Sequence, residues 1–320
     1  MISVIVPVRN NPAGIRELLD RLAVQTLPRD CFEVVIGDDG SRPGTLAGAV
    51  RRDEWVRVTR GSPQTSYAAR NRAARTARGG VLAFCDSDCL PEPTWLEQGL
   101  AALKRAEVVA GEVTFVLPDS PTVWSLLTVD MFLDQERNVL FGRGVTANLF
   151  VRRGLFDELG GFDEALPSGG DYDFVRRSVE LGKSLAYAPT VVVRHPTLDG
   201  PWPFLRKVWG TNRWAAVRRA RAGEHPDLIG VLSFVPGLGV ALARRQALRP
   251  VLSLSRGRLA VAGLRPRPWY DLRAMAVLYL LVSYVAGLGR ARGWIEGRAL
   301  RQRDPAATGQ SHDSPALDLH

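Results

Sequence analysis

An apolar run over residues 81–85 stops abruptly at Asp86-Ser87-Asp88, and Pro91 then interrupts the chain. Such a run, bounded by turn residues, is typical of a buried strand, and here it places two carboxylates where the strand ends. Ligands bind at that edge in open α/β sheets, and hard divalent cations take carboxylate oxygens and bridge to substrate phosphates. A solvated turn that contains two aspartates is the alternative.

Apolar runs and helical periods alternate at short intervals through the first 110 residues. We expect strands over residues 2–8, 32–37, 55–59 and 81–85, and helices over about 15–22, 66–78 and 94–105. This alternation predicts a Rossmann-like, mostly parallel α/β sheet with helices on both faces. The strand over 32–37 runs into Asp38-Asp39, so two expected strands end in acidic pairs at the same edge of the sheet.

The pattern becomes mixed beyond residue 107. We expect strands near 108–117, over 146–151 and over 185–193, the last broken by Pro189, and a helix near 122–136. A glycine turn lies at 160–164. The segment Gly170-Asp171-Tyr172-Asp173 has the composition of a loop entering a helix, where the helix dipole favours carboxylates.

The character of the chain changes at residue 201. Residues 201–300 contain 17 basic and four acidic side chains, against 23 and 26 in residues 1–200. Tryptophans alternate with these basic residues, as in an interfacial helix. The uncharged stretches 228–243 and 274–289 fall short of the roughly 17–20 residues that a membrane span needs. Interfacial or re-entrant helices, short tilted spans and a packed helical hairpin all fit this pattern.

We therefore expect a catalytic domain over residues 1–215, a helical, membrane-associated region over 216–300, and a disordered tail over 301–320. Basic residues beside apolar stretches favour anionic lipid over nucleic acid as the partner of residues 201–300. Three cysteines do not make a disulfide framework, and no secretory signal opens the sequence. The expected location is cytoplasmic, peripheral or attached to the inner face of the cell membrane.

Six motifs in this order resemble the family 2 glycosyltransferases, which have the A-type nucleotide-sugar-binding fold. They are Ser3-Val4-Ile5-Val6-Pro7-Val8-Arg9-Asn10, Val34-Val35-Ile36-Gly37-Asp38-Asp39-Gly40-Ser41, Ala69-Arg70-Asn71, Phe84-Cys85-Asp86-Ser87-Asp88, Gly160-Gly161-Phe162-Asp163-Glu164 and Gly170-Asp171-Tyr172-Asp173. The resemblance covers about residues 1–215 and implies a nucleotide-binding half over about 1–110 and an acceptor half over about 111–215.

The resemblance implies a nucleoside-diphosphate-sugar donor and assigns its contacts. Pro7, Val8 and Arg9 would line the nucleobase pocket, and Asp38 and Asp39 would belong to the nucleotide site, with Asp39 accepting a hydrogen bond from the base. Arg70 could approach the diphosphate, since arginine suits phosphate recognition. A solvated arginine on a helix face is the alternative for that residue.

The same resemblance places a divalent ion, Mn²⁺ or Mg²⁺, on the segment that follows the fourth strand. Asp88 would bind the metal directly, Asp86 would contact the ribose or a metal-bound water, and Ser87 would complete the donor site. The ion would neutralise the departing diphosphate. His195 occupies a place where some relatives have a histidine near the metal, although a hydrogen-bonded structural histidine fits as well.

Asp171 would be the general base that removes the acceptor hydroxyl's proton during a single inverting displacement. The family usually has an acidic residue directly before this aspartate, where this chain has Gly170. Gly161 and Phe162 would belong to an acceptor-side turn, or to an ordinary glycine turn. Asp173 would either contact the acceptor or serve as a first-turn carboxylate of the helix.

The implied enzyme is an inverting hexosyltransferase that adds one sugar to a sugar, a lipid-linked or a small-molecule acceptor, in cell-envelope glycan, glycolipid or secondary-metabolite glycosylation. Arg213-Trp214 is similar to the end of the Gln-x-x-Arg-Trp signature of processive synthases, but Gly210 stands in the glutamine position. Three rival functions stay open: a nucleotidyltransferase, a degenerate transferase that binds nucleotide sugar without turnover, and a non-catalytic nucleic-acid- or lipid-binding protein.

Overall fold

The computed structural model describes residues 1–50, 54–225 and 270–303. Within this described part the chain divides into two compact units, of which the first spans Met1–Gly200 and the second begins at Pro201. The domain boundary predicted near residue 215 falls inside helix α8 (Pro201–Arg221), which continues through that position. The predicted extents of the catalytic and C-terminal regions stay predictions.

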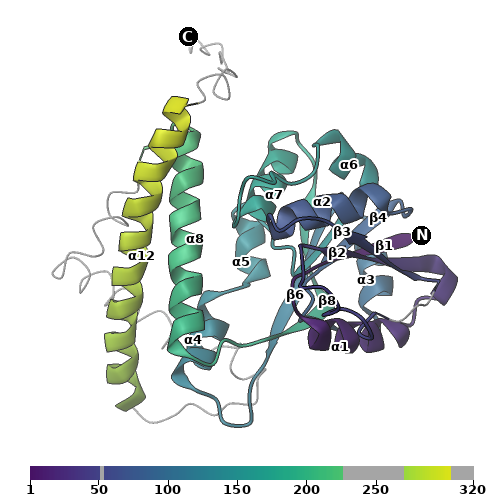
Figure 1. Ribbon diagram of the computed structural model, residues 1–320, viewed down its shortest axis with the longest axis horizontal. Coiled ribbons are helices and arrows are strands. Elements are labelled where there is room, and N and C mark those ends of the chain that lie inside the picture. Colours follow the sequence, from purple (N-terminus) through teal and green to yellow (C-terminus); the bar gives the residue numbers. More distant parts are fainter. Residues whose placement is uncertain (51–53, 226–269, 304–320) are drawn as a thin grey trace. The chain divides into compact units, whose positions relative to one another are not determined.

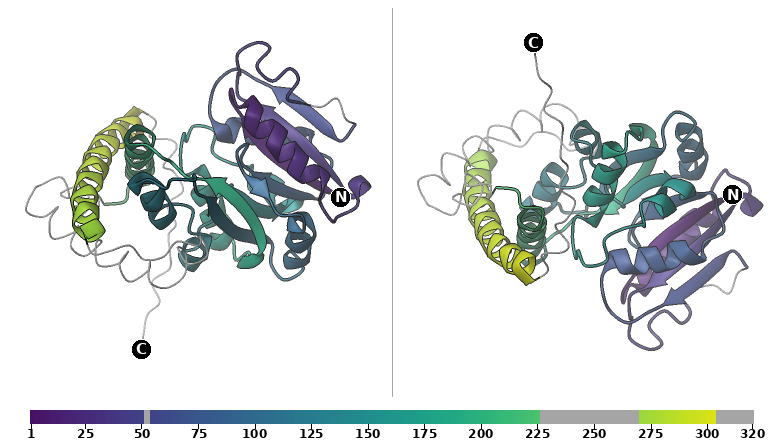
Figure 2. Two further views of the ribbon diagram at one scale, coloured as in Figure 1. Left: turned by 90° about the horizontal axis from the view of Figure 1, so that it is seen from below. Right: turned by 90° about the horizontal axis from the view of Figure 1, so that it is seen from above.

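One eight-stranded sheet forms the centre of the first unit, in the order β3-β2-β1-β4-β7-β6-β8-β5 (Figure 1, Figure 2). Its strands are β1 (Ile2–Val8), β2 (Phe32–Asp38), β3 (Val56–Arg60), β4 (Val81–Cys85), β5 (Leu90–Pro91), β6 (Val108–Val116), β7 (Asn148–Arg152) and β8 (Leu185–Pro196). The four strands β3, β2, β1 and β4 run parallel, as do β6 and β8. Only β7 and β5 run against their neighbours. The predicted mostly parallel sheet is confirmed.

Helices cover both faces of the sheet, as predicted (Figure 1). Leu18 of α1 (Pro12–Ala23) and Trp95 of α3 (Trp95–Ala102) are buried in the core of one face. The opposite core contains buried residues of α2 (Ser66–Thr76), α6 (Arg153–Glu158) and α7 (Gly170–Glu180). In β1 the side chains of Val4 and Val6 enter the first core and that of Ile5 enters the second, so both faces of this strand are buried.

Local sequence explains where the helices beside the parallel strands begin. Asn11 accepts a hydrogen bond from the Gly14 amide, and Pro12 occupies the first position of α1, where its missing amide hydrogen costs nothing. Thr65 caps α2 by accepting from the Ala68 amide. Small alanines bring α2 close to β1 and β2, and its side chains Arg70 and Asn71 are buried there.

Several segments differ from the sequence prediction. The single helix expected over 122–136 is two helices, α4 (Val123–Met131) and α5 (Gln135–Leu140), because Leu133 adopts a left-handed conformation with φ of 55°. Helix α6 was not predicted, and a short 3₁₀ turn, η1 (Arg29–Cys31), precedes β2. Strand β8 continues past Pro189 to Pro196, because the proline lies at an irregularity in its pairing with β6.

The described part of the second unit is a pair of helices, α8 and α12 (Tyr270–Arg303), which lie side by side (Figure 1, Figure 2). They run parallel, because Gly289 of α12 lies against Trp209 of α8 and Gly297 lies against Val217, so they do not form the antiparallel hairpin that the sequence allowed. The Arg213 guanidinium donates to both carboxylate oxygens of Glu296, at 2.7 and 3.1 Å. The helices approach closely at Gly293, where a Cβ would collide with the carbonyl oxygen of Arg213. Helix α12 reaches Arg303, so residues 301–303, which were predicted to belong to a disordered tail, are helical.

Among the described helices, none combines the length and the apolar character that crossing a membrane requires. The uncharged stretch 274–289 lies within α12. The other stretch, 228–243, lies outside the described residues, and so do residues 304–320.

Candidate active site

The parallel strands deliver their carboxyl ends to one edge of the sheet. In the β1–β2 pairing Val8 lies opposite Asp38, and β4 follows on the other side of β1. The Asp39 amide donates to the Val8 carbonyl at 2.9 Å, so the first acidic pair directly adjoins the end of β1. Pro7 and Val8 are buried, whereas Arg9 is exposed. The predicted nucleotide-site residues on β1 and β2 are therefore neighbours.

Both carboxylates of the first acidic pair are buried and fixed by backbone amides. Asp38 and Asp39 each expose 6% of their surface. Oδ1 of Asp38 accepts from the Ser41 amide at 2.8 Å, and Oδ1 of Asp39 accepts from the Gln64 amide at 2.9 Å. A carboxylate offers about four acceptor positions, so the pair retains capacity for ligand donors while its orientation is fixed.

The second acidic pair lies on the loop after β4 and is more open. Asp86, Ser87 and Asp88 are all half-buried. The Ser87 hydroxyl accepts a hydrogen bond from the side-chain amide Nδ2 of Asn11 at 3.2 Å, which connects the loop to the start of α1. The Asp88 side chain is 43% exposed, and its Oδ1 lies 3.7 Å from Nε2 of His195.

The group Asp86, Asp88, Cys89 and His195 has ligand atoms within 4.8 Å of one another. The buried Cys89 thiol lies 3.7 Å from the Ala147 carbonyl oxygen, and the Cys85 thiol and burial raise its pKa well above the usual value. That thiol stays protonated at neutral pH and is a poor ligand. Two carboxylates and an imidazole remain, a donor set that fits Mn²⁺ or Mg²⁺.

Arg70 connects α2 to the second acidic pair. Its guanidinium donates to Asp86 in an ion pair, and the residue is only 4% exposed. The buried Nε of Arg70 finds no hydrogen-bond partner within the described residues. An arginine buried with unused donor capacity is costly unless a ligand completes its bonds. This environment favours the diphosphate contact over the alternative of a solvated helix-face arginine.

Asp171 lies in the first turn of α7, and both of its carboxylate oxygens accept hydrogen bonds. Oδ1 accepts from the Tyr67 hydroxyl and the Tyr172 amide, both at 2.9 Å. Oδ2 accepts from the Thr146 amide at 3.2 Å and lies 3.4 Å from the Thr146 hydroxyl. The residue is 9% exposed. Two backbone amides and two hydroxyls thus fix the orientation of this carboxylate.

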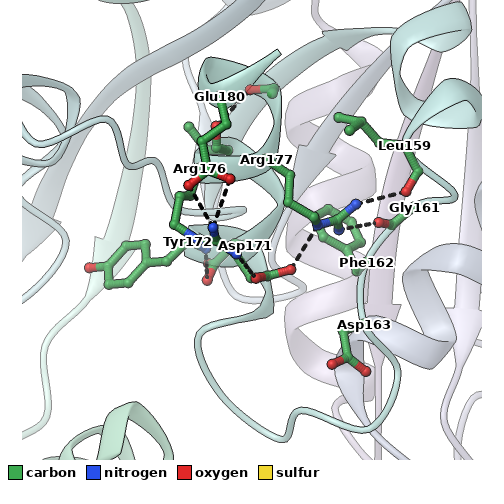
Figure 3. Close-up of polar contacts among 12 residues, drawn as sticks. Leu159, Gly161, Phe162, Asp163, Asp171, Tyr172, Arg176, Arg177 and Glu180 are labelled. Atoms are coloured by element: carbon green, nitrogen blue, oxygen red, sulfur yellow. Dashed lines mark hydrogen bonds and ion pairs between the residues drawn. The ribbon is translucent and has the colours of Figure 1, made fainter. Parts of the chain in front are cut away.

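Asp173 faces two arginines of its own helix. Its carboxylate accepts from Arg176 and Arg177, each at 2.9 Å. Burial opposes the charge, but the hydrogen bonds from these arginines outweigh it and hold the pKa of Asp173 below its ordinary value. Arg177 also donates to the carbonyl oxygens of Leu159 and Gly161, both at 2.7 Å (Figure 3). Asp173 thus orients the arginine that fixes the glycine turn.

The Phe162 side chain lies in the core rather than on the surface. Its ring packs against those of Tyr67, Phe84, Phe156 and Phe174, with centroids 5.0–5.5 Å away. Asn71 bonds its backbone on both sides, accepting from the Phe162 amide at 3.0 Å and donating to the Phe162 carbonyl at 2.8 Å. The buried Phe162 ring is therefore not available to contact an acceptor, and any acceptor contact of this turn would involve its backbone or its exposed neighbours.

Three buried side chains of α2 thus reach three separate segments of the site. Tyr67 contacts Asp171, Arg70 contacts Asp86, and Asn71 contacts the turn at 160–164. Their i, i+3 and i+4 spacing places them on one face of the helix. Arg70 and Asn71 belong to a motif singled out from the sequence, whereas the roles of Tyr67 and Thr146 were not predicted. The helical spacing was the available signal for Tyr67.

Known proteins share this sequence pattern and fold. The family model described as Glycosyl transferase family 2 matches residues 3–160. Glycosyltransferase AglE of Haloferax volcanii is 35% identical over 204 residues, which cover 61% of this chain and 66% of that protein. The pre-mycofactocin glycosyltransferase of Mycobacterium tuberculosis is 29% identical over 303 residues, 86% of this chain and 60% of that protein. The chain thus spans less than two thirds of either relative.

Solved structures resemble the fold. The mannosyltransferase PcManGT of Pyrobaculum calidifontis, in complex with GDP-Man and Mn²⁺, has a TM-score of 0.56 at 22% identity, covering 90% of this chain and 86% of that one. Residues 1–349 of TarS of S. aureus, in complex with UDP-GlcNAc, give a TM-score of 0.51 at 18% identity, covering 94% and 91%. At these identities the likeness is one of fold.

Proposed function

The chain belongs to glycosyl transferase family 2, and we propose that it moves one sugar from a nucleoside-diphosphate sugar to an acceptor hydroxyl with inversion at the anomeric carbon. One observation supports this most directly: Tyr67 and Arg70, one turn apart on α2, contact Asp171 and Asp86. Side chains at that spacing have Cβ atoms about 5–6 Å apart. One face of α2 therefore contacts both the donor-side and the acceptor-side carboxylates.

The donor half would use the first parallel strands. Asp38 and Asp39, fixed at the ends of β1 and β2, suit the hydroxyls and amide hydrogens of a nucleoside, because both carboxylates are buried acceptors. Arg70 would turn its unused donor capacity toward the diphosphate. Pro7 and Val8 would border the base, with Arg9 at the exposed rim.

A divalent ion, Mn²⁺ or Mg²⁺, would be held by Asp88, Asp86 and His195. When bound, it supplies charge neutralisation of the departing diphosphate. Asp86 and Asp88 would provide carboxylate oxygens as ligands, and the protonated Cys89 thiol would not bind the ion. Arg70 would release Asp86 as it turns to the anionic donor.

Asp171 would act as the general base. The acceptor oxygen forms a bond to the anomeric carbon, the bond from that carbon to the diphosphate oxygen breaks, and the acceptor's proton passes to the Asp171 carboxylate. A single buried carboxylate suits one displacement and inversion, in contrast to the paired carboxylates of glycosidases. The acceptor would enter past the turn at 160–164, which Asn71 and Arg177 fix in place.

Single addition fits the position of Arg213. This arginine, part of the Arg213-Trp214 pair, is engaged by Glu296 of α12, and Gly210 replaces the glutamine of the processive signature. We propose a sugar, lipid-linked or small-molecule acceptor in cell-envelope glycan, glycolipid or secondary-metabolite glycosylation. One relative is named for pre-mycofactocin.

We further propose that the basic pair of helices α8 and α12 binds an anionic membrane surface from the cytoplasmic side. Trp202, Arg206 and Lys207 are all exposed at the start of α8, the tryptophan to 81%. An exposed tryptophan beside basic side chains suits the interface of anionic lipids. Co-sedimentation with phosphatidylserine vesicles should fall in the variant Arg206→Gln/Lys207→Gln/Trp202→Ala. Equal recovery of variant and parent with these vesicles would contradict the proposal.

The function is tested with the full chain and a panel of nucleoside-diphosphate sugars with Mn²⁺ or Mg²⁺. A donor that binds raises the unfolding temperature, and turnover with an acceptor releases a nucleoside diphosphate and a glycoside of inverted anomeric configuration. Retained configuration would contradict the inverting mechanism. Release of pyrophosphate from a nucleoside triphosphate instead would favour a nucleotidyltransferase.

A further inference from the structure

The Tyr67 ring fills the space beside the residue that precedes Asp171. A Cβ at Gly170 would lie only 2.9–3.1 Å from three atoms of that ring. The ring has little room to move, because Tyr67 is 5% exposed and packs against Phe162 at a centroid distance of 5.5 Å. Position 170 is therefore restricted to glycine by Tyr67, a residue 103 positions earlier in the sequence.

The Tyr67 hydroxyl completes this arrangement with two hydrogen bonds. It donates to Oδ1 of Asp171 at 2.9 Å and accepts from the Gly169 amide at 3.1 Å. Burial and the nearby Asp171 charge raise the pKa of the Tyr67 phenol well above the usual value, so the phenol keeps its proton at neutral pH. The hydroxyl is thus a permanent donor to the carboxylate.

We infer that Tyr67 is the positioning residue of Asp171, orienting this carboxylate toward the acceptor hydroxyl. Tyr67 fixes one carboxylate oxygen and Thr146 fixes the other, so rotation about the carboxylate is blocked. Arg70, one turn further along α2, pairs with Asp86. The same helix therefore sets the position of the base relative to the donor-side carboxylates.

This inference rests on the proposed function, because it assumes that Asp171 is the base. The variant Tyr67→Phe keeps the ring, and with it the packing against Gly170 and Phe162, but removes the hydroxyl. A single hydrogen bond of this kind corresponds to about tenfold in rate. We expect kcat to fall about tenfold while the KM for the donor sugar and the unfolding temperature change little.

Tyr187→Phe is the matched control. The Tyr187 hydroxyl donates to Oε2 of Glu112 at 2.6 Å, so the substitution removes a comparable tyrosine–carboxylate bond outside the candidate site. Its kcat should match the parent. If Tyr67→Phe is folded and its kcat lies within twofold of the parent, the positioning role is overturned.

The double variant Asp171→Asn/Tyr67→Phe and its two single variants separate the inference from the proposed function on which it rests. In an Asp171→Asn background, Tyr67→Phe should cause no further loss, since the hydroxyl acts through that carboxylate. If Asp171→Asn itself keeps full turnover, the assigned base is wrong and the proposed function fails with it. If Asp171→Asn removes turnover but Tyr67→Phe alone leaves kcat unchanged, only the positioning role fails.

Gly170→Ala tests the packing half of the inference independently. Its Cβ should displace the Tyr67 ring and lower kcat. In a Tyr67→Ala background, which lacks the ring, Gly170→Ala should cause no further loss of kcat. Normal kcat in Gly170→Ala, with unchanged stability, would show that the Tyr67 ring does not restrict position 170 to glycine.

Discussion

The carboxylates after β4 and the carboxylate at the start of α7 have contrasting environments. The Asp88 side chain is 43% exposed, and Asp86 beside it is paired with Arg70. Asp171 is 9% exposed and accepts hydrogen bonds on both oxygens from Tyr67, Tyr172 and Thr146. The pair after β4 is open and includes an ion pair between Asp86 and Arg70, whereas Asp171 accepts hydrogen bonds from neutral donors.

This difference corresponds to two kinds of chemistry. A metal and diphosphate site must accept an ion from solvent, so its carboxylates must be open and its arginine must be able to change partners. A general base must meet one hydroxyl in one geometry, and small displacements of a catalytic group can cost about 100-fold in rate. Fixation by neutral donors, without a competing cation, serves that need.

The largest effect should follow from Asp171→Asn. The substitution keeps the shape of the side chain but removes its ability to take a proton, and general base catalysis contributes about 10²–10⁴-fold. We expect turnover to fall about 1,000-fold, measured as nucleoside diphosphate release, with donor binding unchanged in a thermal-shift titration. Asp157→Asn, on an exposed aspartate of α6, is the control. Full activity of Asp171→Asn would place the base elsewhere.

A substitution in the open pair, Asp86 and Asp88, should impair binding before turnover, in contrast to Asp171→Asn. Asp88→Asn removes a metal ligand and leaves the Asp171 cluster intact, so binding should suffer first. We expect Mn²⁺ affinity, followed by calorimetry with a nucleoside diphosphate present, to fall on the order of 100-fold. Glu92→Gln is the control, because Glu92 lies nearby but pairs with Arg194. If Mn²⁺ binds the two variants equally, Asp88 is not a ligand.

Asn71→Ala tests whether the contact between α2 and the turn at 160–164 stabilises the fold. The substitution leaves the buried amide and carbonyl of Phe162 without partners, and each such loss costs about 1–3 kcal/mol. The free energy of unfolding, from urea titration, should fall by about 2–3 kcal/mol. Thr76→Ala, which removes a local hydroxyl–carbonyl bond of the same helix, should cost less. Equal losses would argue against a special role for Asn71.

The sequence located the open carboxylates because their signal is local. An apolar run that ends in two aspartates marks a strand end, and the parallel arrangement of β1, β2 and β4 brings those ends together. The same rule placed Asp38-Asp39 beside them. Arg70 stood among several similar arginines, and only burial separates it from Arg75, whose side chain is 66% exposed.

The environment of the base could not be predicted in this way. Tyr67 and Asp171 are 104 residues apart, and no local pattern links a tyrosine in an alanine-rich helix to a distant carboxylate. The break between α4 and α5 also lacks a local signal, because Leu133 adopts positive φ without a glycine or proline nearby. Phe162 was expected at the acceptor, but an aromatic cluster formed by distant segments takes its ring into the core.

The smallest effect, and one restricted to stability, is expected for Asp173→Asn. Asp173 lies two residues after Asp171 on the same helix, but arginines surround it. Its pKa is lower in the folded protein than its ordinary 3.8, so the stabilisation is fully present above that value and is lost as the pH falls through the folded pKa. We expect a loss of about 1 kcal/mol at pH 7.

Urea unfolding from pH 7 down to pH 3 checks this prediction. The difference between Asp173→Asn and the parent should be constant at pH 5–7 and should shrink below about pH 4. Turnover should stay within severalfold of the parent, because Arg177 keeps its bonds to the carbonyl oxygens of Leu159 and Gly161. A fall in kcat comparable to that of Asp171→Asn would mean that Asp173 shares the chemistry, and the contrast between neutral and cationic partners would then not separate the base from its neighbour.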